Sequence, residues 1–187
     1  MKKPTALLDH LHAATLRVAK FHIVFVLLFI AQTIVFHASK VITPELLLKR
    51  WFAVSLLAAV TIAVWLTARS KPSAASVYRT VLGAIIIADI AFAAFNVYTQ
   101  RGYASKSVFL FVIPIIVAAV LLNRSVLYAV AGLCAAVYST TVVMYFVNNF
   151  NEGYMSEMYA EIGLYSGLFL TIAALLWATI HKHSARN

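Results

Sequence analysis

The chain has 187 residues, of which 63% are apolar and only 11% are charged, whereas soluble domains average about 45–50% apolar and about 25% charged residues. A mean hydropathy of +0.90 excludes a soluble fold. The 15 basic residues against six acidic ones point to anionic lipid rather than to nucleic acid, because no basic run is interleaved with aromatic residues. The composition therefore predicts an all-α protein that crosses a membrane several times.

The first 18 residues form a segment of their own ahead of the apolar runs. Residues 5–18 place their large apolar side chains at helical spacing, which predicts an amphipathic helix lying in the membrane interface. The alternative is a cytoplasmic extension of the first span. Charged residues and the lack of a small-residue cleavage pattern argue against a signal peptide, so we expect the segment to be retained. The apolar positions are Leu7, Leu8, Leu11, Ala14 and Val18, with Thr15 at the edge of their face.

Apolar runs separated by polar clusters predict a transmembrane domain of six helices over residues 19–181. About twenty apolar residues cross a bilayer as a helix. The fourth span is the weakest prediction, because it holds only about sixteen residues with Pro114 at its centre, where proline removes a backbone donor and kinks a helix. An odd number of crossings would require that one of the six predicted spans does not cross the membrane. The predicted helices cover about 19–38, 50–68, 79–99, 107–122, 125–147 and 160–181.

The distribution of Lys and Arg predicts that both termini, including the tail at 182–187, face the cytoplasm. With the N-terminus inside, ten basic residues fall on cytoplasmic segments and five on the opposite side, as the positive-inside rule favours. We therefore expect a multi-pass protein of a prokaryotic inner (plasma) membrane with an N-in/C-in arrangement. The five basic residues on the outer side are Lys40, Lys49, Arg50, Arg101 and Lys106.

Two polar residues of the third span are the first candidates for a ligand-binding or switch site. Asp89 is the only acidic residue deep in a predicted span, and a carboxylate in hydrocarbon is costly unless it faces the bundle interior or water. Asn96 lies seven residues further on the same helix face and extends a polar seam toward Gln100. The pair fits a proton or cation site, a signalling switch, or a structural hydrogen-bonding group between helices.

Tyr138 and Thr141 of the fifth span are the other two candidates for ligand binding. They belong to the hydroxyl-rich sequence Tyr138 to Thr141, and together with Asp89 and Asn96 they would wall a pocket. The structural alternative is that these hydroxyls donate to carbonyl oxygens of the preceding helical turn, as hydroxyls in membrane helices usually do.

Small residues at helical spacing mark two helix-packing stripes. Gly163 and Gly167 form a GxxxG pattern in the sixth span, and Gly132 and Ala136 begin a similar stripe in the fifth. Small residues at this spacing let helix backbones approach closely. The stripes either pack the fifth and sixth spans on each other, which is the simpler interpretation, or form the seam of a homodimer.

The sequence indicates neither a catalytic site nor a metal or cofactor site. Cys134 is the only cysteine, and His22 and His37 are fifteen residues apart in one span, a separation of roughly 22 Å that prevents them from sharing a metal ion. Motifs for nucleophilic hydrolysis, zinc proteases and phosphate-binding loops are missing from the sequence. We expect no enzymatic activity, and we rank a membrane enzyme acting on lipids last.

The order of features from the third to the fifth span resembles the six-span N-terminal sensor region of bacterial membrane histidine kinases. An Asp in an aliphatic helix, Asp89, is followed by the sequences 97–102 and 107–119, a short turn at Asn123 and Arg124, and the sequence 125–138. The resemblance covers about 75–180 and implies a membrane sensing or scaffolding role. The sequence holds no phospho-acceptor helix or nucleotide-binding motif, so His181 and His183 are not expected to be phospho-acceptors.

These observations together predict a sensor-like or accessory module that works through helix packing with itself or with a separate signalling subunit. A ligand, lipid or partner that favours one arrangement of the bundle would shift the sixth span and the tail after it. The alternative is the substrate-binding membrane subunit of a small-solute transporter. The lipid bilayer is the one partner that both hypotheses require.

Overall fold

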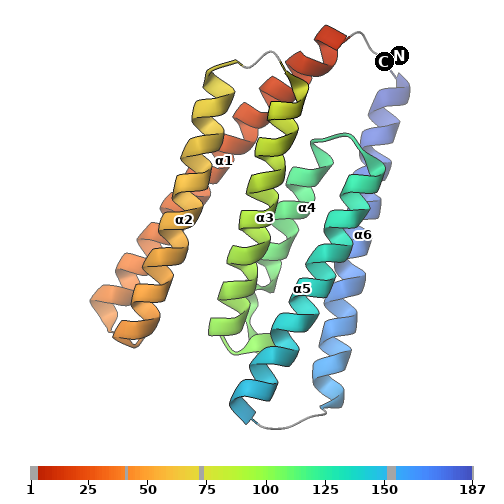
Figure 1. Ribbon diagram of the computed structural model, residues 1–187. Coiled ribbons are helices and arrows are strands. Elements are labelled where there is room, and N and C mark those ends of the chain that lie inside the picture. Colours follow the sequence, from red (N-terminus) through yellow and green to blue (C-terminus); the bar gives the residue numbers. More distant parts are fainter. Residues whose placement is uncertain (1–3, 41, 72–73, 151–154, 187) are drawn as a thin grey trace. The chain divides into compact units, whose positions relative to one another are not determined.

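The computed structural model of the chain describes residues 4–40, 42–71, 74–150 and 155–186 (Figure 1). These residues form α-helices and two short 3-10 helices, and no strand occurs among them. The all-α prediction is thus confirmed for the described part of the chain. Five of its helices are long and apolar enough to cross a membrane, which agrees with a multi-pass membrane protein.

The chain divides into two compact units, Met1–Ala88 and Asp89–Asn187. The first unit contains α1 (Pro4–Ser39), α2 (Pro44–Arg69) and the first part of α3 (Ala75–Thr99). The second contains the rest of α3, the 3-10 helices η1 (Gly102–Ala104) and η2 (Lys106–Phe111), α4 (Val112–Ala119), α5 (Arg124–Phe150) and α6 (Ser156–Arg186).

In the first unit, α1 and α2 pack against each other along a hairpin. The hydroxyl of Thr43 caps α2 by accepting a hydrogen bond from the Leu46 amide at 3.3 Å, and Pro44 occupies the first turn. Proline suits this position because its missing N–H would have no partner there and its fixed φ fits a helix. Helix α2 thus begins at Pro44, about six residues before the predicted boundary at residue 50.

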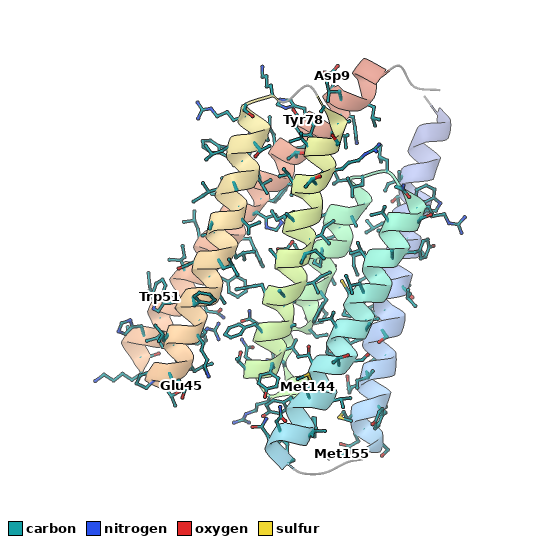
Figure 2. All side chains as sticks on the ribbon, viewed as in Figure 1. Asp9, Glu45, Trp51, Tyr78, Met144 and Met155 are labelled. Carbon is teal, nitrogen blue, oxygen red and sulfur yellow. The ribbon has the colours of Figure 1, made fainter. Side chains whose placement is uncertain are left out.

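The N-terminal segment is continuous with the first span. Helix α1 has no break at residue 18 and measures about 54 Å, well beyond the roughly 30 Å hydrocarbon core. Leu11, Ala14 and Val18 are buried in the protein, and the neighbouring His12 lies 3.0 Å from the hydroxyl of Tyr78, which Figure 2 labels. Protein therefore covers much of the stripe that was expected to contact lipid, and placement in the membrane interface stays a prediction.

The second unit is built around α4, which packs against both α5 and α6 (Figure 1). Helices α5 and α6 also pack against each other along their lengths. The buried face of α5 includes Leu127, Ala131, Cys134 and Tyr138, whereas α6 contributes Met158, Phe169 and Ala173. Most of α6 remains uncovered, because only 11% of its most apolar stretch is buried inside the protein.

The fourth predicted span differs from the single helix expected over 107–122. Residues 106–111 form η2, and only 112–119 form α4. Pro114 is the third residue of α4, and its ring is incompatible with an α-helical carbonyl four residues earlier, which explains why the α-helix begins just before it. With about 2.0 Å per residue in η2 and 1.5 Å in α4, the segment reaches about 24 Å. It is shorter than the other spans, so six complete crossings stay a prediction.

A close contact fixes the turn between α3 and η2. Gly102 has φ +62°, and a Cβ atom on it would lie 2.7 Å from Cδ1 of Tyr145 in α5. Its neighbour Arg101 also has a positive φ of 74°. The left-handed backbone and the short distance to the ring both require glycine at position 102.

We expect Gly102→Ala to lower the free energy of unfolding by about 1–3 kcal/mol, because the methyl group would overlap the Tyr145 ring in a strained backbone. Gly83→Ala is the matched control, since a Cβ atom there meets nothing within 4 Å and alanine favours the helix by up to about 1 kcal/mol. Reversible unfolding in mixed micelles measures both. Equal stability of the two variants would contradict the tight turn.

Candidate functional site

The four predicted ligand-binding or switch residues all belong to the second unit, where each is buried. Asp89 and Asn96 come from α3, and Tyr138 and Thr141 come from α5; their exposed fractions are 3%, 1%, 0% and 9%. Asp89 lies within range of an electrostatic interaction with Cys134 of α5. The second unit thus collects polar groups from two helices in its interior, as the sequence suggested for the two residues of α3.

A chain of hydrogen bonds runs from Asn96 to η2. Asn96 donates through Nδ2 to the carbonyl oxygen of Phe92 at 2.8 Å, and its Oδ1 lies 3.4 Å from Nε2 of Gln100. The hydroxyl of Ser107 then donates to Oε1 of Gln100 at 2.7 Å. The polar seam predicted toward Gln100 is present and continues to Ser107. We call Asn96, Gln100 and Ser107 the amide chain.

The amide chain joins α3 to the 3-10 segment that precedes α4. Ser107 is further held by its own amide, which donates to the hydroxyl of Ser105 at 3.1 Å. Sequence analysis did not single out Ser107 as a site residue, because the partner of its hydroxyl, Gln100, is seven residues away across a turn of irregular backbone. The chain can position η2, and any movement of α3 at this end would be passed to η2 through it.

Tyr138 lies among three aromatic rings from η2 and α6. Its ring makes edge contacts with Phe111, Tyr165 and Phe169, with centroid distances of 5.9, 5.6 and 6.1 Å. We call these four residues the aromatic cluster. Contacts of this kind contribute about 0.5–1.5 kcal/mol each beyond the area they bury. Tyr138 is therefore first a packing residue that links α5 to η2 and α6.

The hydroxyl of Tyr138 is enclosed and has no hydrogen-bond partner among the described residues. Glu161 and Tyr165 of α6 lie within range of an electrostatic interaction with it. Thr141, by contrast, donates to the carbonyl oxygen of Val137 at 2.7 Å, as the structural alternative predicted. Of the two α5 candidates, Tyr138 alone keeps an unused polar group that faces the interior.

The small-residue stripes of α5 and α6 do not pack these helices on each other. Gly132, Gly163 and Gly167 are exposed, and a Cβ atom on any of them would meet nothing within 4 Å. Ala136 is also exposed. The simpler interpretation was therefore wrong: α5 and α6 meet through larger side chains such as Tyr138 and Phe169. The homodimer seam stays a prediction.

Arg50 of the first unit is a buried cation that the sequence analysis placed among the loop charges. Its exposed fraction is 4%, its Nη2 donates to Oε1 of Gln32 at 3.0 Å, and its Cζ lies 4.7 Å from the ring centroid of Phe36. The distance of each residue from the turn could have indicated this contact. Gln32 lies seven residues before the end of α1 and Arg50 six residues after the start of α2, so a helical hairpin places them at similar heights along the two helices.

Among the described residues, no group of three or more His, Cys, Asp or Glu side chains could hold a metal ion. No protein-family model, no curated protein and no solved structure matches the chain. The fold and the buried residues place the chain in a broad class of protein. It is helical, five of its described helices are long and apolar enough to span a membrane, and polar groups are buried in both of its units.

We expect Ser107→Ala to lower the free energy of unfolding by about 0.5–1.5 kcal/mol, because the Oε1 atom of Gln100 loses its 2.7 Å donor. Ser139→Ala is the matched control. Its hydroxyl donates only to the carbonyl oxygen of Ala135 in the preceding turn, so its loss should change stability by less than about 0.5 kcal/mol. Unfolding in mixed micelles compares the two variants, and equal losses would argue against a specific role of the amide chain.

Proposed function

We propose that the chain is a sensor-like or accessory module of an inner membrane, which acts by association of its helices with a second copy or with a separate subunit. The observation that carries this proposal is the uncovered face of α6. Among the described residues, no atom lies within 4 Å of the position that a Cβ atom would take on Gly163 or Gly167. In lipid, exposed small residues favour close approach of another helix, because packing and not hydrophobicity drives helix association there.

The uncovered stripe of α6 is longer than the GxxxG pattern alone. Exposed small residues recur every three or four positions over roughly 27 Å of the helix, on the side opposite buried Phe169. A second helix could therefore lie along most of the apolar part of α6. The stripe consists of Ala160, Gly163, Gly167, Thr171, Ala174 and Ala178.

The length of α6 supports a role in transmitting a signal. Its apolar part covers Ser156–Ile180, and the helix continues without a break to Arg186. A shift or rotation of α6 in the membrane would therefore move the residues after the apolar part as a rigid extension. The resemblance to six-span sensor regions of histidine kinases is consistent with this role, with both termini in the cytoplasm.

The buried polar groups of the second unit supply a switch in this proposal. Asp89 and Asn96 lie in α3, and the amide chain leads from Asn96 to η2. Tyr138 couples α5 to α6 through the aromatic cluster. A ligand or partner that changes the hydrogen bonding of one of these groups would favour one arrangement of the unit over another. We place the two-state element at Asp89, Asn96 and the α6 stripe.

Gly167→Leu should weaken self-association of the full chain about tenfold, equivalent to about 1.4 kcal/mol, because the leucine side chain separates the two helix backbones. Energy transfer between labelled copies in phospholipid vesicles, measured at several protein-to-lipid ratios, reports the association. Thr179→Leu is the matched control, since it adds the same side chain to an exposed position beside the stripe.

Two results would refute the seam. One is a wild-type chain that stays monomeric at every protein-to-lipid ratio, and the other is a Gly167→Leu variant that associates as well as Thr179→Leu. Gly132→Leu tests the competing stripe on α5 in the same assay, and a larger loss there would move the seam to α5.

Labelling of introduced cysteines tests the orientation and the number of crossings. In a Cys134→Ala background, single cysteines at Thr5 and Ser184 should react with a membrane-impermeant reagent only when the cytoplasmic face is open, because an even number of crossings puts both termini on that side. Labels on opposite faces would show an odd number of crossings, with the residue 106–119 segment failing to cross.

A further inference from the structure

Arg50 is a cation in an apolar helix pair whose hydrogen bonding is incomplete. A guanidinium group has five N–H donors, and the described part of the chain supplies one acceptor, Oε1 of Gln32. The ring of Phe36 lies against one face of the group and offers a cation–π contact but no acceptor for the remaining donors. The remaining N–H donors of the Arg50 guanidinium group are thus free to bind a further acceptor.

The nearest carboxylate in the sequence does not neutralise this charge. Glu45 accepts from Nζ of Lys49 at 2.6 Å on the exposed side of α2. Among the described residues, no carboxylate forms an ion pair with Arg50. A buried charge without a counter-ion is strongly unfavourable, and buried arginines are almost always paired. The first unit therefore lacks an anion at this place.

The remaining guanidinium nitrogens of Arg50 are not completely enclosed, although the residue as a whole is only 4% exposed. None of its guanidinium nitrogens is among the enclosed side-chain atoms that lack a partner, so each nitrogen either is hydrogen-bonded or retains accessible surface. Gln32 and Phe36 thus hold the side chain, while its unused donors keep some accessible surface. An acceptor from outside the chain could therefore complete the hydrogen bonding of Arg50.

The level of Arg50 along α2 also suits an anion of the membrane surface. It lies six residues, about 9 Å, from the start of the helix at Pro44. Figure 2 shows Glu45 at that end and Trp51, the neighbour of Arg50, further along α2. Indole rings favour the headgroup level, where the phosphates of lipids lie.

We propose that Arg50, positioned by Gln32 and Phe36, binds a phosphate group, and that its source is the headgroup of a phospholipid. The flat guanidinium presents parallel N–H donors that match two phosphate oxygens, which makes arginine the preferred residue for such recognition. A phosphate bound here supplies the missing counter-ion and fastens the α1–α2 hairpin to the bilayer surface.

Native mass spectrometry of the full chain in detergent tests the site, with phosphatidylglycerol as the probe and diacylglycerol of the same acyl chains as the ligand without phosphate. We expect the phospholipid to bind at least about tenfold more tightly than diacylglycerol, and Arg50→Gln to remove that difference. Lys49→Gln removes the same charge from the adjacent exposed position and should change binding less than about twofold.

Gln32→Glu tests the site without emptying it, and so covers the case in which Arg50→Gln does not fold. The new carboxylate would pair with Arg50 inside the protein, so we expect a folded chain that is at least as stable and binds phosphatidylglycerol about tenfold more weakly. Retained binding in this variant overturns the proposal, as do equal affinities for the two lipids or equal effects of Arg50→Gln and Lys49→Gln.

Inorganic phosphate added to the same samples separates the two sources of the ligand. No displacement of the lipid at millimolar phosphate supports the headgroup as the natural occupant. Displacement that disappears in Arg50→Gln retains the phosphate site but overturns the assignment to a lipid.

Discussion

In hydrocarbon, hydrogen-bond donors and acceptors have no water to bind, and each must find a partner within the protein. The described helices meet this need for the backbone, and buried hydroxyls meet it locally: Thr15, Thr33 and Thr61 each donate to the carbonyl oxygen four residues earlier at 2.7–2.8 Å. Other buried polar groups reach beyond the local backbone. Arg50 donates to Gln32 of α1, and Asn96, besides donating to the carbonyl oxygen of Phe92, lies 3.4 Å from Nε2 of Gln100.

Helix formation followed from composition and from polar breaks, because a long apolar run in a membrane has few alternatives to a helix. The boundaries were less accurate, since the helices extend beyond the apolar runs: α1 and α2 both begin well before the predicted first and second spans. The 3-10 conformation of η2 could not be predicted from hydropathy. It depends on how Pro114, the turn at Gly102 and the Tyr145 ring constrain a short backbone segment.

For the candidate site, the sequence was a guide to which residues are unusual but not to what they contact. Asp89 and Asn96 stood out because polar residues are rare in such helices. The partners Ser107, Phe111 and Tyr165 come from other segments, so no spacing along the chain connects them to the candidates. The glycine stripes show the opposite problem. Their spacing is visible in the sequence, but whether they face a neighbouring helix depends on rotations of α5 and α6 that larger side chains determine.

The short reach of η2 and α4 has a consequence for the surrounding lipid. Phe109 and Ile116 of this segment are exposed, with 60% and 50% of their surfaces accessible, so they would meet acyl chains if the segment lies in the bilayer. A segment of about 24 Å is matched by a hydrocarbon layer thinner than the usual one of about 30 Å, whereas the long α5 and α6 beside it can tilt to adapt. Bilayer deformation at this flank would make the protein's conformation sensitive to acyl-chain length and would bias its distribution toward thinner regions of the membrane.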